Sequence, residues 1–180
     1  AGFATLRVER SGLGDSEGPA CTELDLTAEL EGWQAVSSYF QQHPRVLTDA
    51  RFLYARSLGG FLAPLLWAPG AFSALAVWGT SAQPWPRCML AASERQYRLA
   101  GRSGALLERT LARLAELHEL VYARGLTPEQ AFQRRPDLRD TDPVSFAGGY
   151  VYGRVARFFQ QLVARDIAAA WRAGECPVLA

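Results

Sequence analysis

A long run without a charged side chain, from Ser57 to Pro86, constrains the fold of this chain most strongly. Charged residues make up 21% of the sequence, so a run that excludes them must be shielded from water. It can be a membrane span, part of a buried core or the wall of a pocket. Glycine and proline interrupt it at Gly59-Gly60, Pro64 and Pro69-Gly70.

These interruptions argue against a membrane span. Proline lacks an amide donor and clashes with the preceding helical turn, so backbone groups around Pro64 and Pro69 would be unpaired in lipid. The run therefore predicts two short, buried helices that meet at Ala68-Pro69-Gly70. We expect this broken helix pair, over residues 58–78, to form the centre of a globular fold.

The balance of charges limits the partners that the chain attracts. It has 19 basic and 18 acidic residues, a formal net charge of +1, and all its basic residues are arginine. An arginine-rich, lysine-free chain without an overall positive field is not expected to gather nucleic acid or an anionic membrane. Its 180 residues, 49% of them hydrophobic, are enough for a single globular domain over residues 1–180.

The cysteines predict a reducing compartment and no metal centre. Cys21, Cys88 and Cys176 are odd in number and far apart, which argues against a disulfide framework and against a zinc or iron–sulfur knuckle. The first residues contain no basic region followed by an apolar one, so no export signal is visible. We therefore expect a cytoplasmic protein without a bound metal.

Alternating hydrophobic residues predict a small amount of β-structure. Alternation over residues 4–8 and 22–26 predicts a short N-terminal hairpin. Alternation over residues 88–92 and 97–99 predicts a second hairpin in the middle of the chain.

Helical periods and capping residues account for most of the remaining chain. They predict helices over residues 28–43, 103–124, 127–134 and 143–173, and a further helix that begins near Thr48-Asp49 and runs into the uncharged stretch. The fold class expected is α+β and mainly helical, with five to seven helices around the broken helix pair.

Histidine is the only residue type that offers a candidate for catalysis. The sequence contains no P-loop, no G-x-G-x-x-G, no H-E-x-x-H and no G-x-S-x-G motif. Of its two histidines, His118 lies in the apolar stripe of the helix over residues 103–124. It is either a core histidine or a proton carrier in a pocket, and it leaves open whether the chain is an enzyme.

A cluster of aromatic and arginine residues predicts a ligand site on the last helix. Tyr150 and Arg154 are four residues apart, Tyr152 lies between them, and Gly148-Gly149 would let a ligand approach the helix. Aromatic rings beside a guanidinium group can hold a flat anionic ligand by stacking and paired hydrogen bonds. The alternative is an amphipathic core helix whose arginines are solvated.

Tryptophan residues predict a second part of the same site. Trp67 and Trp78 lie within the uncharged stretch and Trp85 lies near its end, so they can form one wall. Ordinary core packing of these rings is the alternative. We expect Trp67 and Trp78 to line the ligand site and Tyr150, Tyr152 and Arg154 to contact the ligand.

The order of these features resembles the siderophore ferric reductase (FhuF-like) family, over roughly residues 33–162. The resemblance lies in the broken apolar segment Ala55 to Pro69, a short strand region at Arg87 to Ala100, and helices like Leu106 to Arg124 and Phe146 to Leu162. It implies a bacterial protein that binds a siderophore-type iron chelate.

The chain departs from this family at its C-terminus. The family's reductases end in a cysteine pair followed by C-x-x-C, which holds a [2Fe–2S] cluster, whereas Cys176 is the single cysteine near the end of this sequence. An iron–sulfur cluster is therefore not expected, nor any other cofactor. The leading hypothesis is a non-redox binding domain for a small anionic or aromatic ligand. The alternative is a helical protein-interaction domain or a homodimerising subunit without catalytic activity.

Overall fold

The fold is mainly helical α+β, as the sequence predicts, with seven α-helices and a three-stranded sheet in the computed structural model, which describes residues 2–47, 49–67 and 71–180. The chain forms two compact units. The first, here called the sheet unit, consists of Ala1–Gly18, Thr27–Ala82 and Asp166–Ala180. The second, the helical unit, consists of Pro19–Leu26 and Gln83–Arg165. The single domain expected from chain length stays a prediction.

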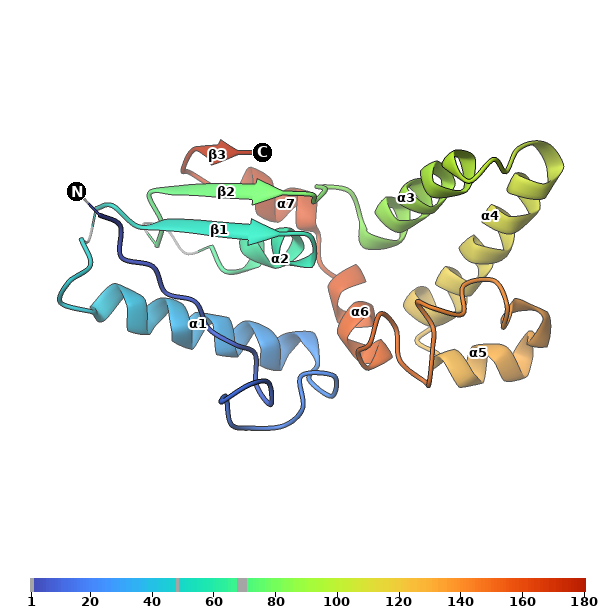
Figure 1. Ribbon diagram of the computed structural model, residues 1–180, viewed down its shortest axis with the longest axis horizontal. Helices are drawn as coiled ribbons and strands as arrows, with labels where there is room; N and C mark the ends of the chain where they lie inside the picture. Colours follow the sequence, from blue (N-terminus) through green and yellow to red (C-terminus); the bar gives the residue numbers. More distant parts are fainter. Residues whose placement is uncertain (1, 48, 68–70) are drawn as a thin grey trace. The chain divides into compact units, whose positions relative to one another are not determined.

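The sheet unit is built on three parallel strands in the order β1-β2-β3 (Figure 1). They are β1 (Phe52–Arg56), β2 (Ala74–Trp78) and β3 (Val178–Leu179). Parallel neighbours need a crossover connection. Between β1 and β2 this connection includes α2 (Leu58–Leu62) and a 3₁₀ turn, Ala63–Leu65.

One face of this sheet carries the core of the sheet unit. Its buried members are Ala55, Ala63, Leu75 and Val77. Trp171 of α7 (Ile167–Arg172) packs against the same core, and the Asp166 side chain caps that helix by accepting the Ala169 amide at 2.8 Å. The unit also contains α1 (Leu26–Gln42), which confirms the helix predicted over residues 28–43.

The uncharged stretch is buried at residues 60–64 and at alternate positions of β2, but it is exposed at Trp78 and over residues 82–84, and only its first half is helical. It forms α2 and the 3₁₀ turn and then the central strand β2, so the prediction of a helix pair is wrong in its second half. A short apolar run can form either a buried strand or a buried helix. Here the parallel pairing with β1 makes the second half of the run a strand. The predicted junction at Ala68-Pro69-Gly70 lies outside the described residues.

Two further predictions of the N-terminal half are corrected. The helix expected from Thr48-Asp49 is replaced by β1, which begins at Phe52, and Thr48 itself lies outside the described residues. The N-terminal hairpin is absent from the described part of the chain, because residues 4–8 and 22–25 form no strand. Residues 4–8 are exposed, so alternation there does not reflect burial on one face.

The helical unit begins with two packed helices, α3 (Trp85–Leu99) and α4 (Gly104–His118). Helix α3 replaces the hairpin predicted over residues 88–99. Pro86 near its start suits the first turn of a helix, where a missing amide costs little. Helix α4 continues into a π-helical turn, Glu119–Ala123, and together they confirm the helix predicted over residues 103–124.

A capping box and an ion-pair network organise the next segment. Helix α5 (Pro128–Arg134) starts at Thr127, whose amide donates to Gln130 Oε1 at 2.9 Å while its hydroxyl accepts the Gln130 amide at 3.3 Å. A 3₁₀ turn, Pro136–Leu138, follows.

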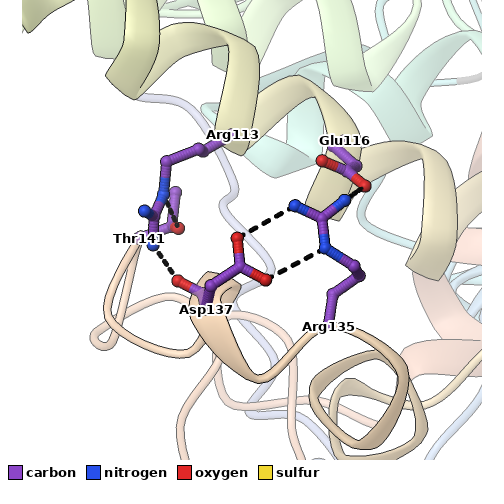
Figure 2. A network of polar contacts seen from close by, with 5 residues as sticks. All are labelled: Arg113, Glu116, Arg135, Asp137 and Thr141. Atoms are coloured by element: carbon purple, nitrogen blue, oxygen red, sulfur yellow. Dashed lines mark hydrogen bonds and ion pairs between the residues drawn. The ribbon is translucent and has the colours of Figure 1, made fainter.

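Figure 2 shows how this 3₁₀ turn is joined to α4. The Arg135 guanidinium donates two hydrogen bonds of 2.9 Å to the Asp137 carboxylate and also contacts Glu116 of α4. Arg113 of α4 donates to the Asp137 carbonyl and, at 3.3 Å, to the Thr141 hydroxyl. These charges are partly exposed, so the network orients the turn and contributes modestly to stability.

The long helix predicted over residues 143–173 is wrong. Residues 142–155 form a loop, which ends at α6 (Ala156–Val163), and α7 is separate. Gly148, Gly149 and Gly153 have φ values of 58°, 83° and 72°. A right-handed helix needs negative φ, so these glycines shape turns and do not lie within a helix. No helix among the described residues is long and apolar enough to cross a membrane.

Candidate functional site

Six ring-bearing side chains of the helical unit form one contact cluster around His118. We call this the aromatic cluster; it consists of Trp85, His118, Tyr122, Phe146, Tyr152 and Phe159. The His118 ring centroid lies 5.0 Å from that of Tyr122 and 6.0 Å from that of Phe146. The Trp85 ring lies 4.9 Å from Phe159 and 5.6 Å from Tyr152.

The cluster is assembled from four separate segments of the chain. His118 ends α4, and Tyr122 follows in the π-helical turn, so one helical segment supplies both of these rings. Single π-helical turns of this kind are rare and are found frequently at functional sites. Trp85 begins α3, and Phe159 belongs to α6. The loop over residues 142–155 adds the remaining two rings.

His118 is buried in this cluster as a neutral imidazole. Its side chain is 3% exposed, and neither ring nitrogen has a hydrogen-bond partner in the described part of the chain. Burial lowers the pKa of His118 to about 4, against smaller opposing effects of the Asp142 charge and the Pro86 carbonyl. By the geometric criteria for a hydrogen bond, the Pro86 carbonyl and the His118 ring are not paired. A neutral imidazole has one donor and one acceptor nitrogen.

The two tyrosines of the cluster are also held in their neutral form. Burial raises the pKa of Tyr122, and the neighbouring Tyr152 adds to the rise, while the Trp85 indole group opposes it. Burial likewise raises the pKa of Tyr152, and the Ser145 side chain opposes that rise. The Tyr122 hydroxyl, like His118, is buried without a hydrogen-bond partner among the residues described. Buried polar groups are nearly always paired, so the unpaired atoms of His118 and Tyr122 make this cluster the candidate functional site.

The loop over residues 142–155 is fixed at its base and strained at Tyr152. The Asp142 carboxylate accepts the Ser145 amide at 3.0 Å, and the Asp142 carbonyl accepts the Phe146 amide at 3.2 Å. The Ser145 carbonyl in turn accepts the Tyr152 amide at 2.6 Å. Tyr152 has a φ of 49°, an unfavourable value for a side chain of its size, and is 38% exposed. Tyr152 is therefore the part of the cluster that solvent reaches.

The other residues predicted to contact a ligand have contacts of their own. The Tyr150 hydroxyl donates to the Glu23 carboxylate. The Arg154 guanidinium is buried, 4.3 Å from the centre of the Phe158 ring. Since residues 142–155 are a loop, Tyr150 and Arg154 do not share a helix face.

Trp67 and Trp78 both belong to the sheet unit. Trp67 packs edge-on to Trp171 at 6.4 Å, and its ring fills the space beside Gly174. Trp78 is 62% exposed at the end of β2, where the Arg56 guanidinium lies 5.2 Å from its ring centre. Of the residues predicted from the sequence, the structure thus brings His118, Tyr152 and Trp85 into one cluster and leaves Trp67 and Trp78 outside it.

Several residues of the cluster were missed in the sequence. Tyr122 lies four residues after His118, and this helical spacing is a signal that could have found it. Phe146 and Asp142 reach the cluster through turns of the loop, for which no hydrophobic period exists. In the described part of the chain, no group of three or more histidine, cysteine, aspartate or glutamate side chains could hold a metal ion.

Comparisons with known proteins give no match. The sequence matches no family model, no curated protein and no solved structure. The resemblance to FhuF-like reductases stays a prediction from the order of sequence features.

Proposed function

We propose that the chain is a non-redox binding domain that holds a small aromatic ligand at the aromatic cluster. The observation that carries this proposal is the neutral, buried His118, whose nitrogens lack a hydrogen-bond partner among the described residues. Leaving buried polar atoms unpaired costs free energy, and a ligand with one polar group removes that cost. The surrounding rings offer stacking and edge contacts to a flat molecule.

Tyr152 supports a route by which such a ligand reaches His118. Its ring is the exposed member of the cluster, and its backbone conformation is strained. A ligand that takes the place of this ring against Trp85 and Phe159 lets the loop relax. Strained residues of this kind are often found where a loop closes over a ligand.

Of the two ligand classes expected from the sequence, anionic and aromatic, the contacts of Arg154 favour the aromatic one. Arg154, the arginine expected to bind an anion, stacks on Phe158 and is buried. A siderophore-type iron chelate is the finer form of this proposal, and it rests on the resemblance in sequence order alone.

Nuclear magnetic resonance of the two histidines tests the proposal with phenol as the probe. Phenol has one ring and one hydroxyl group that can pair with a neutral imidazole. We expect phenol to shift the ring nitrogen resonances of His118 and to leave those of His43 unchanged. A His43→Gln variant assigns the signals and should bind phenol as the wild type does. If saturating phenol leaves the His118 resonances unchanged, the proposal fails.

A second candidate function, a homodimerising subunit, is favoured by the open face of the sheet. Phe52, Tyr54 and Trp78 are 55%, 66% and 62% exposed, and the register of β1 on β2 places them on one face. Parallel sheets are normally covered on both faces. We propose that a second copy of the chain covers this face, because β1 is also an edge strand open to pairing.

Light scattering over a range of concentrations tests this second candidate. We expect a dimer that a Tyr54→Ser substitution weakens. Tyr39→Ser is the matched control, since Tyr39 is 63% exposed on α1 and should leave the dimer intact. A monomer at every concentration excludes this function.

A further inference from the structure

A carboxylate stands beside the aromatic cluster. Asp142 is half-buried at the base of the loop that supplies two of the rings, where its carboxylate accepts the Ser145 amide and its backbone carbonyl accepts the Phe146 amide. Ser145 in turn holds the Tyr152 amide at 2.6 Å. The position of the carboxylate is therefore tied to the rings of Phe146 and Tyr152.

Asp142 forms no salt bridge within the part of the chain that the structure describes. Its field reaches three polar members of the cluster, since it contributes to raising the pKa values of His118, Tyr122 and Tyr152. The Arg102 guanidinium lies 4.6 Å from the centre of the Tyr97 ring, and its charge opposes the rise in the pKa of Tyr97 that burial and the Asp142 charge cause. Asp142 therefore contributes a negative charge at the base of the loop that supplies Phe146 and Tyr152.

We propose that the ligand of the aromatic cluster carries a protonated amine. This inference rests on the proposed function and names the class of its ligand. An ammonium group placed between the Asp142 carboxylate and the rings gains an ion pair and the attraction of the ring faces. Its N–H groups also suit the acceptor nitrogen of His118 and the oxygen of Tyr122. A carboxylate on the ligand would instead meet the charge of Asp142 in partly desolvated surroundings.

The aromatic part and the charged part of the ligand have separate places in this arrangement. The aromatic ring of the ligand can pack against Trp85 and Phe159, whose own ring centroids lie 4.9 Å apart. The acceptor groups belong to other segments: Tyr122 to the π-helical turn, His118 to the residue before it and Asp142 to the loop. A ring joined to an amine by a short aliphatic link matches both parts.

Three probes of similar size test the charge of the ligand: benzylamine, benzyl alcohol and benzoate. Their binding to the full chain is measured at pH 7 by calorimetry and by the His118 resonances. We expect benzylamine to bind about ten-fold more tightly than benzyl alcohol, and benzoate to bind most weakly. An Asp142→Asn variant should lose this preference while it keeps the loop, since an asparagine oxygen can still accept the Ser145 amide.

Asp140→Asn is the matched control. Asp140 lies two residues before Asp142 and is exposed, so this variant removes the same charge and should keep the preference for benzylamine. Equal binding of benzylamine and benzyl alcohol overturns the ammonium inference and leaves the aromatic site standing. A preference that persists in Asp142→Asn overturns the role of Asp142. If none of the three probes binds, both the inference and the proposed function fail.

Discussion

At the scale of single residues, burial of His118 makes stability depend on pH. The folded state lowers the pKa of His118 from 6.5 to about 4. Between these values the unfolded chain binds more protons than the folded one, so stability is complete above pH 6.5 and falls as the pH drops toward 4. The loss approaches about 3 kcal/mol at the lower end. Urea unfolding at several pH values measures it.

One variant separates His118 from the other titrating groups. His118→Asn should flatten the dependence of unfolding free energy on pH between 6.5 and 4. A slope equal to that of the wild type in the His118 variant would show that other groups cause the acid destabilisation.

Two neighbouring glycines of α2 should respond to alanine in opposite ways. A Cβ atom on Gly60 would lie 2.4 Å from Cβ and Oγ1 of Thr80, whereas on Gly59 its nearest neighbour would be the Ala55 Cβ at 3.7 Å. We expect Gly60→Ala to destabilise the chain by about 1–3 kcal/mol through overpacking. Gly59→Ala should be neutral or stabilising because alanine favours helix. Chemical denaturation measures both, and similar values for the two variants would contradict the close approach at Thr80.

At the scale of elements, the capping box of α5 should hold that helix at its start. Thr127→Ala removes the hydroxyl that accepts the Gln130 amide, so we expect a loss of about 1 kcal/mol in unfolding free energy. Thr110→Ala is the control, because Thr110 lies within α4 and its hydroxyl donates to the Leu106 carbonyl of the same helix. That change should be neutral or slightly stabilising. A loss at Thr110 equal to that at Thr127 would rule out the cap as the cause.

The helices with local start and stop signals are the ones that the sequence predicts correctly. Thr127, Pro128 and Gln130 define α5 through contacts within four residues, and the apolar stripe of α4 lies on a single face. Strand β2 could not be predicted in this way, because its state depends on pairing with β1 and with β3 from the end of the chain. Tertiary pairing of this kind overrides local periodicity.

The candidate site shows even more clearly what local sequence patterns cannot predict. His118 could be selected from the sequence because it interrupts an apolar stripe. The rest of the aromatic cluster depends on the loop over residues 142–155, which the sequence pattern assigns to a helix. Turns with positive φ at Gly148, Gly149 and Gly153 replace that helix. Their effect is to bring Phe146 and Tyr152 to His118 and to separate Tyr150 from Arg154.

At the scale of the whole molecule, each unit is assembled from segments distant in sequence. The sheet unit takes three segments and the helical unit two, and β3 joins β2 only after the helical unit has been completed in the chain. Each unit also has buried leucines of its own, with Leu75 at 2% and Leu114 at 0% exposure. A core that is complete within one unit should open as a cooperative part of the structure.

Hydrogen exchange with one core variant in each unit tests this division. Leu75→Ala and Leu114→Ala should each cost about 2–5 kcal/mol through the cavity that they leave. We expect Leu75→Ala to speed exchange most in β1, β2 and β3, and Leu114→Ala to speed it most in α3, α4 and α5. This follows because a cavity destabilises first the elements that pack around it. Equal acceleration of both units by either variant would mean that they unfold together, as the single domain expected from chain length requires.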